Sequence, residues 1–383
     1  MQRKARKNDS EDSAMKHTLH KLFSLLLCLV LLLSLAPMAL AEEESLLDEA
    51  ALDRWIQDYL QQHGIGGGNQ LFSVGFCYTA TGDAWYYNGD TFMYSASMYK
   101  VPVAMLLAEK EASGLINQDT DLGGGTLRYL ESTALTFSNN DSGHAMLNYL
   151  GEDNGGKASK LCMKYASLDQ AYYDQDFFDY SYYSARFITQ VMETLCAGGE
   201  ERFPHVIENL LIAQPDSYLN LSLMGKYQVA QKYGAFEERN GNSNNHITAI
   251  VYTPNPIIVT VMTRNVKDFQ QRMADIGEYL ANYALELDGK LQQRQQAQAQ
   301  AEAQAAAQAA AEADQEAQSS SRITFTGGAQ IEGGRARLMP AFYILWAAIA
   351  AFGVLVLLHA AKYRKARAAV ASARSSSGRR RRH

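Results

Sequence analysis

Two uncharged, strongly apolar stretches bracket the chain and limit which part of it can fold as a globular domain. The first, residues 22–41, follows Lys16 and Lys21 and ends in small residues at Ala39-Leu40-Ala41. This order predicts a signal peptide over residues 1–41, with an uncleaved anchor as the alternative. The second stretch spans the 24 residues 338–361, which is long enough to cross a bilayer. It predicts a C-terminal transmembrane helix.

The charge distribution predicts an orientation. Residues 362–383 hold nine Lys or Arg and no acidic residue. Basic residues collect on the cytoplasmic side, so we expect a cytoplasmic tail, an extracellular domain and a single-pass location in the cell membrane. Without the six basic and three acidic residues before position 22 and the nine basic tail residues, 20 basic and 38 acidic residues remain. A segment with a net charge of about −18 is not expected to bind nucleic acid.

The composition of the middle segment changes near Lys290. Residues 290–321 contain no aromatic residue and, after Leu291, no large apolar residue. A helix that is polar or small on every face cannot be a core element. We therefore predict a stalk and juxtamembrane linker over residues 289–337, either partly helical or disordered. The remaining residues, 42–288, are enough for one folded domain.

The hydrophobic pattern of that domain predicts an α+β fold. A helical pattern over residues 45–64 precedes a hairpin pattern over 71–88, and residues 97–211 contain mostly helices and loops. Three strand-like runs follow between residues 227 and 263, and an amphipathic helix covers 266–287. We expect a five-stranded antiparallel sheet covered by the N- and C-terminal helices, with an inserted helical subdomain.

Three short polar motifs follow one another along this domain: Ser97-x-x-Lys100, Ser138-x-Asn140 and Lys232-x-Gly234. Each is a weak signal alone, because Ser97 and Ser138 could cap helices and Lys232 could be a solvated strand lysine. Second copies of the first two patterns begin at Ser13 and Ser243. The order of the motifs and the predicted element around each one select the copies named first.

In this order the three motifs resemble the signature of penicillin-recognising serine acyl enzymes. Residues 80–107 are similar to the hairpin and nucleophile segment of class A β-lactamases, and residues 232–263 to their last three strands. The resemblance covers roughly residues 46 to 287. It implies the β-lactamase/transpeptidase-like fold. The spacing of the histidines and cysteines predicts no metal site, and we expect no cofactor.

The resemblance also implies a role for each motif residue. A serine hydroxyl is a poor nucleophile until a base removes its proton, and a desolvated lysine can act as that base. The implied catalytic residues are the nucleophile Ser97, the base Lys100, the proton carrier Ser138 and the cation Lys232. The implied substrate-binding residues are Asn140, Tyr233, Gly234 and Ala235, the last giving its N–H, with that of Ser97, to an oxyanion hole.

The sequence departs from the family pattern in three places. Asn139 replaces an aspartate, and Tyr233 replaces a short hydroxyl residue, which puts carboxylate recognition in doubt. The loop that carries the deacylating glutamate corresponds to residues 167–186, where no glutamate occurs. Four aspartates stand there instead: Asp169, Asp174, Asp176 and Asp179. Without a base for the hydrolytic water, the acyl-enzyme would persist.

We therefore expect an active-site serine hydrolase that acts on β-lactams, with antibiotic resistance as a consequence, or on D-Ala-D-Ala stem peptides of peptidoglycan. A binding or sensing module that keeps the fold without efficient turnover is the alternative. The missing glutamate and the altered Lys-Tyr-Gly motif favour the alternative. The five retained residues favour the enzyme: Ser97, Lys100, Ser138, Asn140 and Lys232.

Overall fold

The computed structural model describes residues 45–151 and 156–321, which contain one large and one small β-sheet. The large sheet is antiparallel throughout, with the strand order β2-β1-β7-β6-β5. Its strands are β1 (Leu71–Tyr78), β2 (Asp83–Tyr87), β5 (Val229–Glu237), β6 (Ser243–Val251) and β7 (Ile257–Arg264). The small sheet pairs β3 (Met93–Tyr94) with β4 (Tyr182–Tyr183).

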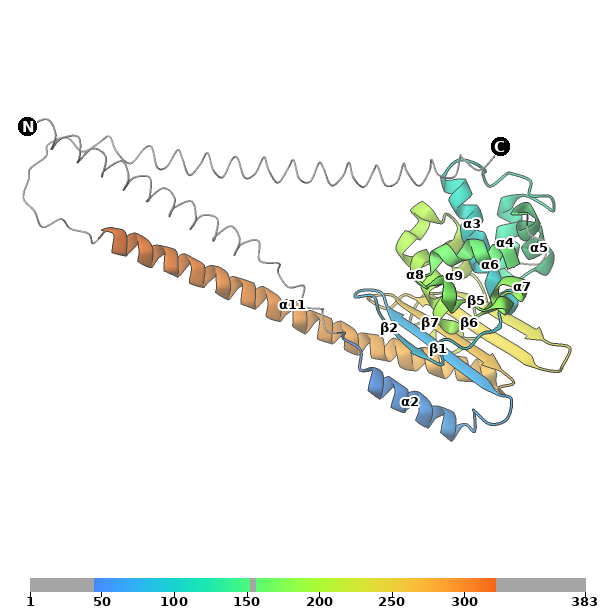
Figure 1. Ribbon diagram of the computed structural model, residues 1–383, viewed down its shortest axis with the longest axis horizontal. Coiled ribbons are helices and arrows are strands. Elements are labelled where there is room, and N and C mark those ends of the chain that lie inside the picture. The colour runs from blue at the N-terminus through green and yellow to red at the C-terminus, as the bar shows by residue number, and fades with distance from the viewer. Residues whose placement is uncertain (1–44, 152–155, 322–383) are drawn as a thin grey trace, which may run out of the picture. The chain divides into compact units, whose positions relative to one another are not determined.

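One face of the large sheet is covered by α2 (Glu49–Gln62) and by the first part of α11 (Phe269–Ser321), as Figure 1 shows. Trp55 of α2 stacks on Tyr279 of α11, with ring centroids 3.5 Å apart. The short α10 (Asn220–Leu223) packs beside α11, where Ser222 Oγ donates to the Ala274 carbonyl oxygen at 2.8 Å. These contacts join α2, near the start of the domain, and α10 to the C-terminal helix α11 on this face of the sheet.

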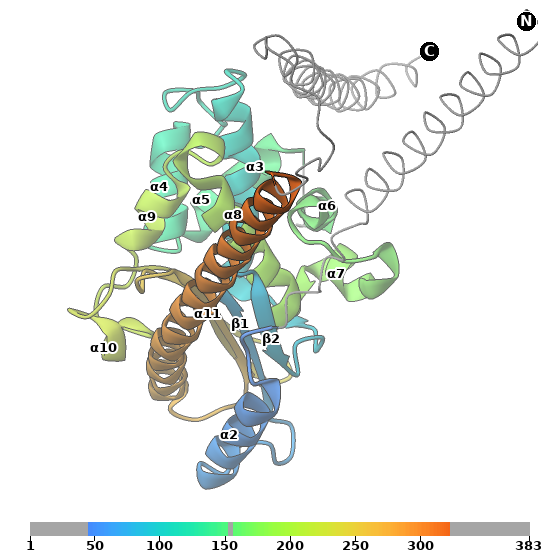
Figure 2. The ribbon, with the colours of Figure 1, turned by 90° about the vertical axis from the view of Figure 1, so that its left-hand side faces the viewer.

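The other face carries a helical layer inserted between β2 and β5 (Figure 2). Its helices are α3 (Lys100–Ala112), α4 (Leu127–Thr136), α5 (Asn140–Tyr149), α6 (Gly156–Cys162), α7 (Gln175–Tyr180), α8 (Ala185–Arg202) and α9 (Val206–Leu211). Three 3-10 turns belong to the same layer: η1 (Ala96–Tyr99), η2 (Met163–Tyr165) and η3 (Gln170–Tyr172). Because both faces are covered, β6 and β7 are buried along almost their whole length.

The structure confirms the α+β class, the five-stranded antiparallel sheet, the two covering helices and the inserted helical layer. One part of the fold prediction needs correction, namely the C-terminal transmembrane helix. In residues 45–151 and 156–321, no helix is long and apolar enough to cross a membrane. In the last described helix, α11, the residues beyond Leu291 are polar or small, and residues 295–315 are exposed.

The predicted segments at the two ends fall outside this description. The predicted signal peptide (1–41), the apolar stretch 338–361 and the basic tail (362–383) lie outside the described residues. The chain divides into two units, up to Glu302 and from Ala303 onward. The described part of the second unit is helical, from Ala303 to Ser321. The predicted domain boundaries stay predictions.

Candidate active site

Ser97 lies in the 3-10 turn η1, directly before α3. The structure therefore places this serine just before the helix begins. The preceding residue, Ala96, has a φ of +48°, in the left-handed region that non-glycine residues seldom adopt. Such strain persists where the surrounding structure fixes the chain. Here it holds the half-buried Ser97 beside the N-terminus of α3.

Lys100 is the first residue of α3, and its side chain is fully buried. Its Nζ lies 3.0 Å from Ser97 Oγ, 2.7 Å from the Ser138 carbonyl oxygen and 2.9 Å from Asn140 Oδ1. Burial lowers the pKa of Lys100 to about 8, because the charged form loses its hydration. Near neutral pH, a fraction of Lys100 is therefore uncharged and able to accept the Ser97 proton.

Ser138 lies between two buried lysines. Its Oγ is 2.9 Å from Lys232 Nζ and 3.5 Å from Lys100 Nζ. Its φ of +58° is again left-handed. Burial, and secondarily the charge of Lys100, holds the pKa of Lys232 well below its usual range. One hydroxyl group therefore connects two amines that both lose a proton more readily than a solvated lysine.

Gly234 allows β5 to pack closely against η1, the turn that carries Ser97, which we call the nucleophile turn. Side chains two residues apart on a strand share a face, so Lys232 and Gly234 point to the same side of β5. A Cβ at position 234 would lie 2.9 Å from the Ser95 carbonyl oxygen and 3.1 Å from Ser97 N. Only a residue without Cβ permits this approach. Ala235 follows on the solvent-exposed part of the same edge strand.

Tyr233 points its ring to the opposite side of β5 and offers no short hydroxyl where the family has one. The ring stacks on Tyr218 at a centroid distance of 5.2 Å, against the core between the sheet and α11. Lys232 Nζ donates to the Tyr233 carbonyl oxygen at 2.7 Å and lies 4.3 Å from the centroid of the Tyr233 ring. Tyr233 therefore contacts the site through its carbonyl group and one face of its ring.

The two asparagines of the second motif have different positions. Asn139 caps α5, because its Oδ1 accepts the Ser142 N–H at 2.8 Å. Asparagine and aspartate cap helices about equally well, so this departure from the family pattern leaves the helix start intact. Asn140 is the first residue of α5, and its Oδ1 accepts from Lys100 Nζ.

Gly143 of α5 shapes the site without having been predicted from the sequence. A Cβ there would lie 2.6 Å from Lys100 Cε and 2.7 Å from the Tyr99 hydroxyl oxygen. The lysine side chain occupies the space that a larger residue would fill. The available signal was a glycine inside a helical pattern, which costs about 1 kcal/mol relative to alanine and therefore calls for a reason.

His246 of β6 fixes the chain that leads into the nucleophile turn. It is fully buried, and its Nε2 lies 2.9 Å from the Tyr94 carbonyl oxygen. Its Nδ1 accepts the Thr263 N–H at 3.2 Å, so the neutral ring donates from Nε2. Burial lowers the pKa of His246 to about 4. No sequence pattern indicated the link of this histidine to the segment before Ser97.

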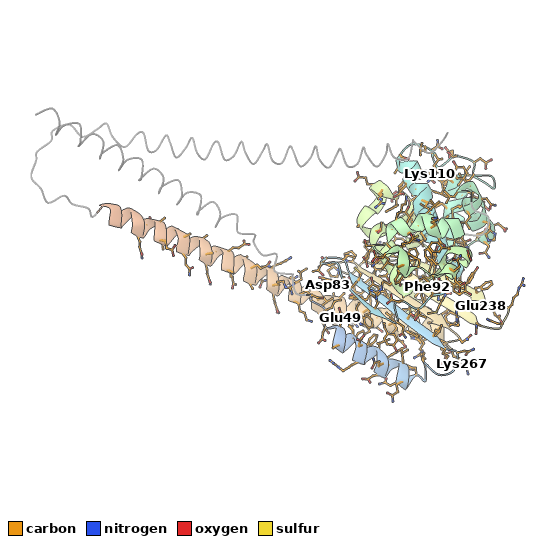
Figure 3. All side chains as sticks on the ribbon, in the orientation of Figure 1. Glu49, Asp83, Phe92, Lys110, Glu238 and Lys267 are labelled. Atoms are coloured by element: carbon orange, nitrogen blue, oxygen red, sulfur yellow. The ribbon has the colours of Figure 1, made fainter. Side chains whose placement is uncertain are left out.

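Residues 167–186, which we call the aromatic loop, place rings at the position in the chain where the family carries its glutamate. Phe177 is fully buried, with ring centroids 4.5 Å from Tyr173 and 5.0 Å from Phe187 of α8. Phe92, which lies between the sheet and the helical layer in Figure 3, joins the same cluster, 6.4 Å from Phe177. The loop is therefore held by an apolar core.

The four aspartates of the aromatic loop are exposed. Asp174 Oδ1 accepts the Phe177 N–H at 2.8 Å and caps α7, and Asp179 Oδ2 accepts from Gln175 Nε2 at 2.9 Å. Among the described residues, none of the hydrogen bonds made by these aspartate side chains reaches Ser97 or Lys100. The structure brings together Ser97, Lys100, Ser138, Asn140 and Lys232, and it brings no loop carboxylate to them.

The described part of the chain contains no group of three or more His, Cys, Asp or Glu side chains arranged to hold a metal ion. The groups that do converge are a hydroxyl beside a partly neutral amine and a second hydroxyl between two amines. Nucleophile, base and proton carrier at hydrogen-bond distance from one another are the parts that acyl transfer requires.

Comparison with known proteins shows which sequences and folds this chain is similar to. Residues 51–139 match the sequence profile of the β-lactamase enzyme family. No curated protein matches the sequence. A β-lactamase from Chitinophaga pinensis superposes with a TM-score of 0.50 at 14% identity, covering 61% of this chain and 98% of its own. The chromosome-encoded β-lactamase of Vibrio parahaemolyticus has a TM-score of 0.48 and 16% identity, with coverages of 61% and 98%.

An ancestral (GNCA) class A β-lactamase has a TM-score of 0.49 at 20% identity, covering 61% of this chain and 99% of its own. The fold shared with the Chitinophaga enzyme is the β-lactamase-like α+β fold. With the profile match, it confirms the resemblance to the β-lactamase family that the motifs indicated. The matched residues 51–139 include Ser97, Lys100 and Ser138, whereas Lys232 was found by the order of the motifs.

Proposed function

We propose that this protein is an active-site serine hydrolase that reacts through an acyl-Ser97 intermediate. The observation that carries the proposal is the hydrogen-bonded chain of Ser97 Oγ, Lys100 Nζ, Ser138 Oγ and Lys232 Nζ, with successive distances of 3.0, 3.5 and 2.9 Å. Both lysines are fully buried and have lowered pKa values. A helix-capping serine needs none of these features.

The proposed chemistry begins when neutral Lys100 takes the proton of Ser97 Oγ, which attacks the substrate carbonyl carbon. The N–H groups of Ser97 and Ala235 stabilise the oxyanion, as the family resemblance implies. Ser138 then delivers a proton to the leaving nitrogen and is reprotonated from the lysines on either side. The C–N bond breaks and the acyl group remains on Ser97.

The proposed substrates are β-lactams or the D-Ala-D-Ala ends of peptidoglycan stem peptides. Each offers a reactive C–N bond and a carboxylate nearby. A carboxylate bound beside Lys232 would favour the charged form of that lysine, because an opposite charge raises a lysine pKa. Since Tyr233 places no hydroxyl there, carboxylate binding would depend on Lys232 and on backbone groups of β5.

The test is to incubate the protein with benzylpenicillin and follow its intact mass over time. We expect an increase equal to the mass of the penicillin in the wild type and in the control Ser113→Ala, whose serine lies at the far end of α3. Ser97→Ala should show no increase. An adduct that persists in Ser97→Ala, or the absence of any adduct in the wild type, would refute the proposal.

A second candidate function is a penicillin- or peptidoglycan-binding or sensing module with little turnover. It is favoured by the aromatic loop, whose described carboxylates make their hydrogen bonds away from Ser97. The same mass experiment separates the two functions. An adduct that disappears within minutes supports a β-lactamase, and one that lasts for hours supports a penicillin-binding or sensing protein.

Export of the domain is a separate proposal. It is supported by the basic, apolar and small-residue order of residues 1–41 and by the location of peptidoglycan outside the cytoplasm. Fractionation of cells that express the full chain tests it. Recovery of the domain only in the cytoplasmic fraction would refute export.

A further inference from the structure

Three aromatic side chains form a continuous surface at one end of the candidate site. They are Tyr94 of β3, Tyr182 of β4 and Phe236 of β5, and we call them the aromatic shelf. The ring centroid of Tyr94 lies 4.7 Å from that of Phe236 and 5.7 Å from that of Tyr182. Phe236 remains 46% exposed, so its ring offers apolar area to a ligand.

The strand geometry places Phe236 on the same side of β5 as the groups that act on Ser97. Side chains at alternate positions share a face, so Phe236 points to the side of Lys232 and Gly234. A Cβ added to Gly234 would lie close to the Ser95 carbonyl oxygen and to Ser97 N. This side of β5 therefore faces η1, the turn that carries Ser97. Between Gly234 and Phe236 stands Ala235, whose N–H is the proposed second donor to the oxyanion.

The shelf is also connected rigidly to the nucleophile turn. Tyr94 precedes Ser97 by three residues, and His246 Nε2 donates to its carbonyl oxygen at 2.9 Å. Tyr94 and Tyr182 are register partners in the small sheet. A substrate whose carbonyl carbon lies at Ser97 therefore meets these rings at a fixed offset from the reacting atom.

The apolar, aromatic character of the shelf indicates which ligand groups it would bind. Three rings from three strands offer an apolar surface of tilted faces and edges, with interplanar angles of 46° between Tyr94 and Phe236 and 71° between Tyr94 and Tyr182. A pair of opposite charges lies near it, where Arg264 Nη2 is 3.8 Å from Glu238 Oε1. Glu238 lies near the outer end of the β5–β6 hairpin in Figure 3. Aromatic rings bind other rings by offset stacking or edge-to-face contact. A methyl-sized or anionic substituent would gain little from such a surface.

We infer that the aromatic shelf is a specificity site that binds an aromatic or large apolar side chain on the acyl part of the substrate. This inference rests on the proposed acyl-Ser97 chemistry and deepens it. It predicts that acyl donors with a benzyl-type substituent acylate Ser97 faster than donors that differ from them only by a methyl group at that place.

Two penicillins with the same ring system, amide and carboxylate provide the test. Benzylpenicillin carries a benzyl group on its side-chain amide, and 6-acetamidopenicillanic acid carries a methyl group there. The second-order rate constant of acylation is measured by intact mass for each probe. The variants are Phe236→Ala and Tyr182→Ala, and the control is Tyr129→Ala, an aromatic residue of α4 that is 56% exposed. Melting temperatures verify that each variant is folded.

We expect Phe236→Ala to lower the rate constant for benzylpenicillin about tenfold and that for the methyl compound less than about twofold, the range of a lost apolar contact. Tyr182→Ala should act in the same direction with a smaller effect, and Tyr129→Ala should change neither rate constant. Equal losses for both probes in folded variants, or no loss for either, would overturn the shelf while leaving acyl-Ser97 chemistry standing. If neither probe acylates the wild type, the proposed function fails and the inference fails with it.

Discussion

The candidate site and the aromatic loop differ in the kind of groups that they bury. At the site, polar groups are buried in contact with one another: Lys100 Nζ has three oxygen atoms within 3.0 Å, and Lys232 Nζ has two within 2.9 Å. In the loop, rings are buried against rings, and the hydroxyl of Tyr173 lies in the interior without a hydrogen-bond partner among the described residues. The first region is built from hydrogen bonds and the second from apolar packing.

In the proposed reaction, this difference separates the two halves of the acyl-transfer cycle. Formation of an acyl-serine needs the nucleophile, the base and the proton carrier, and these side chains lie within hydrogen-bond distance. Release of the acyl group needs a base for water, and the loop that could supply one contributes packing instead. Four experiments test whether the division of roles is real, taken from the largest expected effect to the smallest.

Removing the amine of Lys100 tests the polar region. Lys100→Ala should lower the acylation rate constant about 10³-fold, because a general base contributes on the order of 10² to 10⁴ in rate. Lys110→Ala is the matched control, since Lys110 belongs to the same helix and lies far from the sheet (Figure 3). Acylation by a folded Lys100→Ala at the wild-type rate would contradict the assignment of the base.

Truncating the aromatic core tests the apolar region. Phe177 is fully buried among Tyr173, Tyr183 and Phe187, and Phe177→Ala should lower the free energy of unfolding by about 3 kcal/mol. Urea denaturation measures the loss. Acylation, followed at a temperature where the variant stays folded, should change less than about threefold. A folded variant that no longer acylates would show that the loop takes part in the first half of the cycle.

The pH dependence of acylation tests the state of Lys100. The reaction needs the neutral amine, so below the pKa of about 8 the rate constant should rise about tenfold per pH unit. Above pH 8 it should level off. The same lowered pKa makes the contribution of Lys100 to stability increase as pH rises from about 8 toward its unfolded value near 10.5. A profile that is flat or falls between pH 6 and 8 would refute a lysine base.

Removing a loop carboxylate should have the smallest effect. Asp179 is exposed and bonds to Gln175, so Asp179→Asn should change the lifetime of the acyl-enzyme less than about twofold, the ordinary range for a surface substitution. The decay of the adduct is followed by intact mass after excess penicillin is removed. A lifetime that increases tenfold would identify Asp179 as the missing base. It would contradict the conclusion that the aromatic loop contributes only packing.

The sequence predicted the fold because its signals were local and agreed with one another. The runs HITAIVYT and PIIVTVMT became β6 and β7, and the apolar spacing of residues 266–287 became the part of α11 that packs on the sheet. The transmembrane helix was a different kind of inference. It came from the apolar composition of residues 338–361, which lie outside the described residues.

The motif residues could be named from the sequence because their types and order carry the signal, but their arrangement could not. Nothing in the sequence fixes Ser138 Oγ between two lysines, because that position depends on how α3, α5 and β5 pack. The ring of Tyr233 stacks on Tyr218 and lies beside Lys232 Nζ, and the first of these contacts depends on a different segment of the chain. Gly143 and His246 were not predicted for the site for the same reason: their partners are distant in sequence.

The close fit at Gly143 and Gly234 has a genetic consequence. Every glycine codon becomes an alanine codon by a single base change, and at both positions the added methyl group would lie within 3 Å of atoms beside the candidate nucleophile or base. Neither alanine would alter a residue of the proposed reaction chemistry. A survey of natural variants that inspected only those residues would pass over such alleles, although each would force atoms beside the candidate site to move.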